Sequence, residues 1–405
     1  MKICGIVCEY NPFHLGHRLH IQKIREQLAP DYIIAVMSGN FTQRGDVALF
    51  DKWVRTRAAL QCGIDLVIEL PFISAVQSAE GFAQGAVSLL HSAGCPHLSF
   101  GWENPDLPLL TRFASFLLDE PKDFSRLLKY YLDNGFSFPK ARGAALSSMF
   151  ELPVEQIEPL LVSSNNILAL EYLKAIQKIG SAIIPYPIQR QGLSYNDDTI
   201  DPSCLCSALA IRKEFAAHGL SKDVLSNVPK ESAQEMKAAL EGGMSPMFNE
   251  ALFPLLQYKV RTMSTKQLGD IYEVSEGLEH KIKKAVGSAS SYEELILEIK
   301  SKRYALTRIK RILLYILFDI TKSTAKRLMG VQPYYLRLLG FRKASEALLG
   351  HIAQFSNLPL VTQPLNFKDK HKSLELDVLA TDIYMGLQPK PKPPGLDYSH
   401  KFVIA

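Results

Sequence analysis

Short apolar runs alternate with amphipathic segments along the first hundred residues of the chain. An apolar run that ends in glycine or polar residues predicts a strand, and apolar residues spaced three or four apart predict a helix. We expect strands at residues 3–8, 32–37, 65–71 and 97–101. We expect one helix to start near residue 17 and two others to cover residues 52–62 and 79–93. This alternation favours a doubly wound α/β fold with a parallel sheet. Ligands of such sheets bind beyond the carboxyl ends of the strands, where the loops 11–17, 38–46 and 101–103 should meet.

The pattern becomes more helical further along the chain. Residues 107–152 are amphipathic with a helical period, and Ser163 to Asn166 precede the apolar run 167–179, as expected of a helix N-cap. A short strand at residues 182–186 and a helix that opens at Cys206 follow. Residues 222–332 carry helical patterns with charged faces, and short strands are possible at residues 360–362 and in the C-terminal tail. We predict an α/β domain over residues 1–220 and a mainly α-helical domain over residues 221–405.

The composition is that of an ordinary globular protein. Of the 405 residues, 47% are hydrophobic and 21% are charged, which argues against wholesale disorder. The six cysteines form no C-x-x-C pair, and no apolar run reaches the ~18 residues that a membrane span needs. These features predict a soluble cytoplasmic protein with no membrane partner. The formal net charge of +5 permits a nucleic-acid partner without requiring one.

The strongest candidate for chemistry is the stretch from residue 9 to residue 17. The first apolar run stops at Glu9, and His14-Leu15-Gly16-His17 then stands where a helix begins. The first N–H groups of a helix have no partner within it, so such a junction binds anions, and a glycine lets the backbone approach a phosphate closely. His14 and His17 could donate hydrogen bonds to a leaving pyrophosphate. Metal ligation or helix capping would also explain two histidines.

Other common signatures of phosphate or hydrolase chemistry do not occur. The sequence has no G-x-x-x-x-G-K-[ST] and no G-x-G-x-x-G, which excludes a P-loop and the dinucleotide-binding fingerprint. It also has no H-E-x-x-H and no G-x-S-x-G. No cysteine pair has zinc-ligand spacing and no carboxylate cluster suggests a dedicated cage, so we predict no protein metal site.

Several motifs resemble those of a known family. Residues 9–17, EYNPFHLGH, are similar to the first motif of the HxGH nucleotidyltransferase-like superfamily, which implies a Rossmann-like parallel sheet of the HUP type. Four further segments are similar to the bacterial tRNA(Met) cytidine acetate ligase family: VMSGNFTQRG at 36–45, DLVIELP at 65–71, SNNIL at 164–168 and KRY at 302–304. The resemblance covers nearly the whole chain. It implies an ATP-binding domain followed by a mainly helical, basic tRNA-binding domain.

The resemblance implies a two-step reaction. Acetate would attack the α-phosphate of ATP, which gives acetyl-adenylate and pyrophosphate. The N4 amine of the wobble cytidine, position 34 of elongator tRNA(Met), would then take the acetyl group and release AMP, leaving N4-acetylcytidine. Mg²⁺ would accompany the triphosphate. A carboxylate nucleophile needs no general base, so the lack of a nucleophile–base pair in the sequence is consistent with this chemistry.

The resemblance also assigns the ATP site by position. His14 and His17 would be catalytic, because they would act on the charge of the transition state. The residues implied in ATP binding are Val7, Cys8, Glu9, Tyr10, Asn11, Pro12, Phe13, His14, Leu15, Gly16, His17, Arg18, Leu19, His20, Gly101, Asn165 or Asn166, Arg190, Gln191, Ser207 and Arg212.

A basic stretch in the helical half is the candidate tRNA surface. Between residues 300 and 327, nine lysines and arginines are interrupted by only one acid, Asp319. From the residues alone, they fit the solvated face of an amphipathic helix equally well, whereas the resemblance favours contacts to phosphates. The candidate tRNA contacts are Arg44, Lys302, Arg303, Arg308, Lys310 and Arg311. Lys52 could contact the substrate or form a surface salt bridge.

Two other functions stay open at this point. An enzyme with the same first motif could adenylylate a small phosphorylated metabolite, but such a substrate does not need a basic helical surface. An RNA-binding protein with a vestigial nucleotide pocket is the non-enzymatic alternative, and the intact His14, Gly16 and His17 argue against it. The sequence does not predict an oligomeric state.

Overall fold

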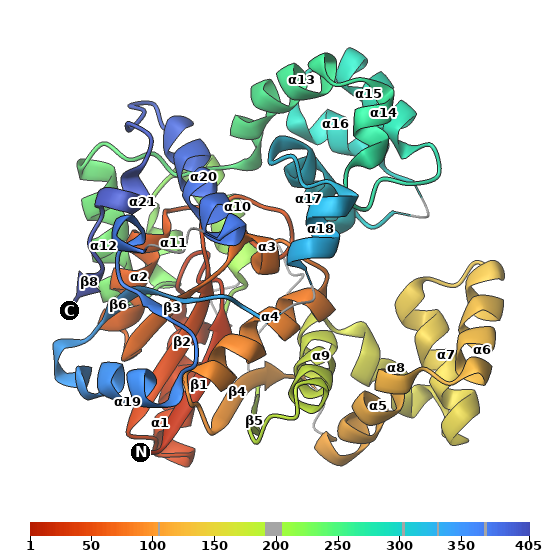
Figure 1. Cartoon of the computed structure of the whole chain (residues 1–405), viewed down its shortest axis with the longest axis horizontal. Coiled ribbons are helices and arrows are strands. Elements are labelled where there is room, and N and C mark those ends of the chain that lie inside the picture. Colours follow the sequence, from red (N-terminus) through yellow and green to blue (C-terminus); the bar gives the residue numbers. More distant parts are fainter. Residues whose placement is uncertain (104–105, 191–204, 302–303, 330–331, 368–370) are drawn as a thin grey trace.

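Eight strands form one mixed sheet at the centre of the computed structural model, which describes residues 1–103, 106–190, 205–301, 304–329, 332–367 and 371–405 (Figure 1). The strand order is β5-β4-β1-β2-β3-β6-β7, and β8 pairs with β6. Five strands run parallel to one another: β1 (Ile3–Cys8), β2 (Tyr32–Ser38), β3 (Leu66–Leu70), β4 (His97–Trp102) and β5 (Ile184–Gln189). The predicted parallel α/β sheet is confirmed, and its fifth strand begins two residues later than predicted.

The central strands are apolar on both faces because helices cover both. In β2, Ile34 and Val36 belong to one hydrophobic core, whereas Ile33 and Ala35 belong to the core of the opposite face. Residues of α4 and α9 complete the first core, and residues of α1 and α2 complete the second. A strand buried on both faces is a continuous apolar run, which is why the sequence pattern identified it. These helices are α1 (Leu15–Gln27), α2 (Lys52–Gln61), α4 (Ala79–Ser92) and α9 (Ser164–Lys178).

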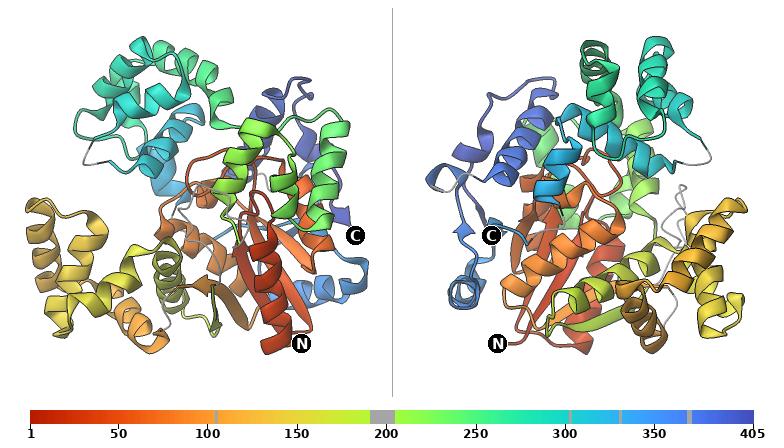
Figure 2. Two further views of the ribbon diagram at one scale, coloured as in Figure 1. Left: turned by 180° about the vertical axis from the view of Figure 1, so that it is seen from behind. Right: turned by 45° about the vertical axis from the view of Figure 1, so that its right-hand side comes forward.

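Two groups of helices extend from one flank of the sheet, apart from each other (Figures 1 and 2). The first, here called the α5–α8 lobe, is inserted between β4 and α9. It consists of α5 (Leu107–Asp119), α6 (Lys122–Asp133), α7 (Phe138–Phe150) and α8 (Val154–Val162). The second, the α13–α18 lobe, consists of η1 (Asn249–Leu252), α13 (Phe253–Thr262), α14 (Thr265–Asp270), α15 (Leu278–Ser288), α16 (Tyr292–Ile299), α17 (Leu306–Leu317) and α18 (Lys322–Leu328).

The other helices pack around the sheet and its loops. They are α3 (Phe72–Ala75), α10 (Ala208–His218), α11 (Lys222–Ser226), α12 (Lys230–Glu241), η2 (Lys343–Ser345), α19 (Ala347–Phe355), η3 (Pro364–Asn366), α20 (Lys372–Gly386) and α21 (Leu396–Ser399). Within the described ranges, none of the helices has the length and apolar character needed to cross a membrane.

The C-terminal half adds three strands to the same sheet. β6 (Leu336–Phe341) pairs antiparallel with β3, while β7 (Leu360–Val361) and β8 (Val403–Ile404) run parallel to β6. The short strands expected near residue 360 and in the tail are thus present, but β6 was not predicted. Its apolar pattern is interrupted by Arg337, which is buried only because distant parts of the chain supply its partners.

The domain boundary predicted at residue 220 stays a prediction.

A buried cluster of charges joins the two ends of the chain. Lys52 Nζ lies 2.8 Å from both carboxylate oxygens of Glu69 and 2.6 Å from Asp397 Oδ2. Arg337 on β6 donates to the other carboxylate oxygen of Asp397 over 3.2 Å. The cluster therefore ties α2 and β3 to β6 and α21. Lys52 has no exposed surface, so its proposed contact with a substrate was wrong and its role is structural.

We expect Lys52→Ala to lower the free energy of unfolding by about 3–5 kcal/mol, because it leaves two buried carboxylates without their shared cation. Urea unfolding followed by intrinsic fluorescence measures the change. The matched control is Lys237→Ala, which breaks an exposed ion pair with Glu241 and should cost at most about 1 kcal/mol. Equal losses in the two variants would contradict the role assigned to Lys52.

Candidate functional site

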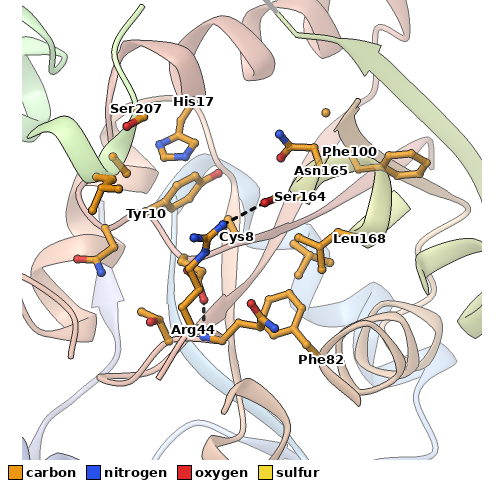
Figure 3. Close-up of a pocket in the computed structure, with 18 of the residues that line it drawn as sticks. Cys8, Tyr10, His17, Arg44, Phe82, Phe100, Ser164, Asn165, Leu168 and Ser207 are labelled. Carbon is orange, nitrogen blue, oxygen red and sulfur yellow. Dashed lines mark hydrogen bonds between the residues drawn. The ribbon is translucent and has the colours of Figure 1, made fainter. Parts of the chain in front are cut away.

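Loops at the carboxyl ends of the parallel strands enclose a cavity of about 730 Å³ (Figure 3). Its walls come from the ends of β1 and β4, the loop after β2, the first turns of α1, α9 and α10, and one side of α17. This is the edge at which the sequence analysis placed the ligand site. The first turns of α1, α4, α9, α10 and α17 lie at the cavity, and the N-terminal end of a helix favours negative charge. The cavity therefore suits an anionic ligand.

The two histidines of the first motif cap α1 with one ring nitrogen each. His14 Nδ1 accepts a hydrogen bond from the Gly16 N–H over 3.0 Å, and His17 Nδ1 accepts one from the His14 N–H over 3.2 Å. A ring nitrogen that accepts carries no proton, so in each neutral ring the proton is on Nε2. The rings stack with their centroids 3.7 Å apart, and both residues line the cavity. The two histidines therefore cap the helix, as one of the alternatives above proposed. Capping uses only Nδ1 of each ring, so both Nε2–H groups can donate to a ligand.

Both histidines are neutral at physiological pH. Burial lowers the pKa of His14 to about 3, and the positive charge of Arg190 adds to the effect. Burial, the neighbouring His14 and Arg190 hold the pKa of His17 well below its usual value. His20 also lines the cavity, and burial, Arg190 and Lys23 lower its pKa to about 4. The histidines are therefore hydrogen-bond donors, and the positive charge of the cavity comes from arginine and lysine side chains.

The glycine of the first motif is required by the histidine before it. A Cβ atom on Gly16 would lie 2.8 Å from Cε1 of His14, closer than two carbon atoms can approach. Any side chain at this position would displace the ring that caps α1. The absence of a side chain at Gly16 therefore leaves room for the His14 ring and lets a ligand approach the backbone.

A chain of polar contacts runs along the wall formed by β4 and α9. Arg190 donates to Asn165 Oδ1 over 3.3 Å, and the Asn165 amide donates to Glu103 Oε1 over 2.7 Å. Arg44, from the loop after β2, donates to Ser164 Oγ over 3.1 Å, as Figure 3 shows. These contacts hold two guanidinium groups at the cavity, where they can meet phosphate oxygens.

Asn165 and Asn166 have different surroundings. Asn165 lines the cavity, whereas Asn166 is fully buried. The Asn166 amide accepts a hydrogen bond from the Glu103 N–H over 2.9 Å and donates one to the Pro159 carbonyl over 3.1 Å. Both of its polar groups are engaged in holding the start of α9. Asn165 is therefore the better candidate for contact with a nucleotide.

The start of α10 closes another side of the cavity. Ser207 caps this helix by accepting a hydrogen bond from the Ala210 N–H over 3.1 Å. Arg212, one turn further on, donates to Asn11 Oδ1 over 2.8 Å and to the Val47 carbonyl over 3.1 Å. Ser207 and Arg212 both line the cavity, so the structure brings these two predicted residues beside the first motif.

Most of the residues predicted to bind ATP lie around this one cavity. Those that line it are Val7, Cys8, Glu9, Tyr10, Asn11, His14, Gly16, His17, Leu19, His20, Gly101, Asn165, Arg190, Ser207 and Arg212. Five others stand outside its wall: Pro12, Phe13, Leu15, Arg18 and Asn166. Phe13 is buried against Tyr10 and His17, and Arg18 faces outward to an ion pair with Glu231. Gln191 lies outside the described residues.

The sequence reasoning missed an apolar wall that faces the polar groups. It is formed by Phe82, Phe100, Leu168, Tyr172 and Ile188, and Figure 3 labels the first three. Phe82, Phe100, Leu168 and Tyr172 stand in apolar segments whose pattern indicates core, and Ile188 lies just beyond the strand predicted at residues 182–186, so no local signal distinguished them. An apolar face opposite polar donors is the usual composition of a nucleotide pocket, because a base is flat and largely apolar.

The loop after β2 lies at the cavity as predicted, but three of its polar residues were not named as candidates. Thr42, Gln43 and Asp46 line the cavity, and the Gln43 N–H donates to Glu9 Oε1 over 2.7 Å. Burial raises the pKa of Glu9, although the hydrogen bond from Gln43 and the charge of Arg44 oppose the shift. Thr42 and Gln43 stand inside the motif at residues 36–45, which was the available signal.

The candidate tRNA contacts divide between the cavity and the outer surface. Arg44, Lys310 and Arg311 line the cavity, and Lys310 Nζ lies 2.7 Å from Asp46 Oδ1. Arg308 stands outside the cavity wall, partly exposed, and pairs with Glu273 over 3.2 Å. Lys302 and Arg303 lie outside the described residues. In the part of the chain that the structure covers, no three histidine, cysteine or acidic side chains group as metal ligands would.

Comparisons with known proteins agree with this geometry. The family model described as HIGH nucleotidyl transferase matches residues 1–396. The chain is 42% identical over 409 residues to the tRNA(Met) cytidine acetate ligase of Thermoanaerobacter sp. (strain X514), and 39% identical over 416 residues to that of Acetivibrio thermocellus, with all of each chain covered.

Solved structures are similar over the whole length as well. Apo TmcAL of Thermotoga maritima matches with a TM-score of 0.94 and 34% identity, and both chains are fully covered. The same protein bound with alpha-thio ATP matches with a TM-score of 0.91 and 33% identity, covering 100% of this chain and 99% of that one. The chain therefore belongs to the tRNA(Met) cytidine acetate ligase family of the HIGH nucleotidyl transferases.

Proposed function

We propose that this chain is an ATP-dependent ligase that joins acetate to N4 of the wobble cytidine, position 34, of elongator tRNA(Met). The observation that carries the proposal is the pair of Nε2–H donors of His14 and His17 at a cavity that also holds Arg44 and Arg190. Full-length relatives at about 40% identity carry the name of this activity, and a similar structure holds an ATP analogue. The protein is an enzyme that binds ATP.

In the first step, a carboxylate oxygen of acetate attacks the α-phosphorus of ATP. A bond forms between that oxygen and phosphorus, the bond to the bridging oxygen breaks, and pyrophosphate leaves with the electron pair. Negative charge grows on the phosphate oxygens, and the neutral His14 and His17 stabilise it by donating from Nε2. Arg190 and Arg44 supply the positive charge. The apolar wall of Phe82, Phe100 and Leu168 would hold the adenine.

In the second step, the N4 amine of cytidine attacks the acetyl carbon of acetyl-adenylate. The new carbon–nitrogen bond forms, the bond between carbon and the phosphate oxygen breaks, and AMP leaves. The amine loses one proton to solvent or to a basic group. We expect the helices beyond residue 220 to dock the tRNA, because α17 brings Lys310 and Arg311 from the second half to the cavity.

Mg²⁺ is expected to arrive with the triphosphate. The carboxylates at the cavity are Glu9 and Asp46, and each already accepts hydrogen bonds from other protein groups. The described residues thus offer no set of side chains that would hold the ion without the nucleotide, and no step above depends on it.

The cytoplasm remains the predicted location of the protein.

We expect His14→Ala and His17→Ala each to lower acetate-dependent ATP–pyrophosphate exchange by about 10²–10³-fold, because each variant removes one donor to the transition state. Exchange of labelled pyrophosphate into ATP, measured without tRNA, tests this step alone. The control is His280→Ala, which removes an exposed histidine on α15 and should leave the exchange unchanged. Full exchange in both motif variants would contradict the assignment.

We expect Arg308→Ala to weaken binding of unmodified elongator tRNA(Met) and to reduce the slope of log K against log salt by about one, because one phosphate contact is lost. Glu273→Ala is the matched control, since it breaks the same ion pair but keeps the cation. Filter binding at several salt concentrations measures both variants. If the two lose affinity equally, Arg308 serves the fold of the lobe and does not contact RNA.

A further inference from the structure

The tip of the hairpin formed by α6 and α7 exposes a cluster of aromatic side chains. The exposed fractions are 61% for Tyr130, 45% for Phe136 and 53% for Phe138. The rings of Tyr130 and Phe136 are joined through Tyr131, whose ring centroid is 5.4 Å from that of Tyr130 and 5.5 Å from that of Phe136, while the Phe138 ring contacts the Arg142 guanidinium. Every residue from 132 to 138 is exposed. A contiguous exposed apolar patch on a surface turn marks an interaction site rather than a part of the core.

Cations outnumber acids on the hairpin, and one of them, Arg126, forms an ion pair with Asp123. The exposed charged residues of the hairpin are four cations, Lys122, Arg126, Lys129 and Lys140, and two acids, Asp123 and Asp133. Exposed aromatic rings interleaved with cations are the composition that binds single-stranded nucleic acid, because bases stack on the rings while lysines contact phosphates. A second copy of this chain fits less well, since a symmetric contact would bring two basic tips together.

The hairpin belongs to a lobe that is anchored at the cavity. The α5–α8 lobe leaves the sheet after β4, where Gly101 lines the cavity, and returns at α9, where Ser164 and Asn165 line it. The hydrogen bond from Asn165 to Glu103 joins the two anchor points. The α13–α18 lobe reaches the same cavity through α17, and both lobes extend from the same flank (Figure 2). An RNA that offers a base to the cavity is therefore flanked by both lobes.

We propose that the α6–α7 hairpin is a second tRNA-binding surface, on which unpaired nucleotides of the substrate stack against Tyr130, Phe136 and Phe138 while Lys129 and Lys140 contact their phosphates. The proposal rests on the proposed function, which supplies the RNA. It assigns a role to a lobe that lies outside both the ATP site and the basic stretch at residues 300–327.

The test compares the double variant Tyr130→Ala/Phe136→Ala with Phe355→Ala. Phe355 is 60% exposed and lies on α19, at the opposite side of the sheet from the hairpin (Figure 1). We expect the double variant to raise the Kd for unmodified elongator tRNA(Met) about tenfold or more, because stacking on an aromatic ring contributes to binding at each base. Fluorescence anisotropy measures the Kd. The control should bind as the wild type does, and acetate-dependent ATP–pyrophosphate exchange should be unchanged in both.

A second variant tests the charges separately. Lys129→Gln/Lys140→Gln should weaken tRNA binding and flatten its salt dependence, by about one unit of slope for each lost phosphate contact. Wild-type tRNA affinity in both hairpin variants overturns the proposal while leaving the ligase function intact. A wild-type protein that neither binds nor acetylates tRNA overturns both. If sedimentation shows that the hairpin variants only abolish self-association, the surface joins two copies of the chain and the proposal is wrong.

Discussion

The hydrogen bond from the Gly16 N–H to His14 Nδ1 determines what the cavity can do. It caps α1, fixes the orientation of the ring and leaves the proton of the neutral imidazole on Nε2. His17 repeats the arrangement one turn later, with the His14 N–H as its donor. Burial keeps both rings neutral, so under the proposed function they would stabilise growing negative charge by donating hydrogen bonds, and the arginines would supply the net charge. Capping uses Nδ1 of each ring and leaves Nε2 for the proposed catalytic role.

The shape of the cavity also depends on the second half of the chain. Gly45 has a φ of +79° at the loop after β2, and a Cβ atom there would lie 2.6 Å from the backbone nitrogen of Arg311. Next to it, Asp46 accepts from Lys310 over 2.7 Å and from Asn249 over 2.6 Å. The loop that brings Arg44 to the cavity is therefore held against α17. The buried Lys52 cluster fixes the C-terminal strands in the same way, so the two halves of the chain are not independent.

Local patterns revealed the parallel strands and the first motif, because both are local properties. A strand covered on two faces is apolar throughout, and a histidine pair at a helix start is visible in the sequence. The remaining features depend on distant partners. Arg337 can lie in β6 only because Asp397 neutralises it, and Phe82 and Phe100 line the cavity only because the sheet places α4 and β4 beside it. Asn165 and Asn166 are alike in sequence, and only their surroundings separate them.

On the proposed function, the residues that anchor the α5–α8 lobe also complete the ATP cavity. Glu103 accepts a hydrogen bond from Asn165, which in turn accepts one from Arg190. The Glu103 N–H donates to Asn166 at the start of α9. Any RNA that changes the position of this lobe therefore acts on the arginine that faces the phosphates. A coupling of this kind is reciprocal, so bound nucleotide must change the affinity for tRNA by the same factor as tRNA changes the affinity for nucleotide.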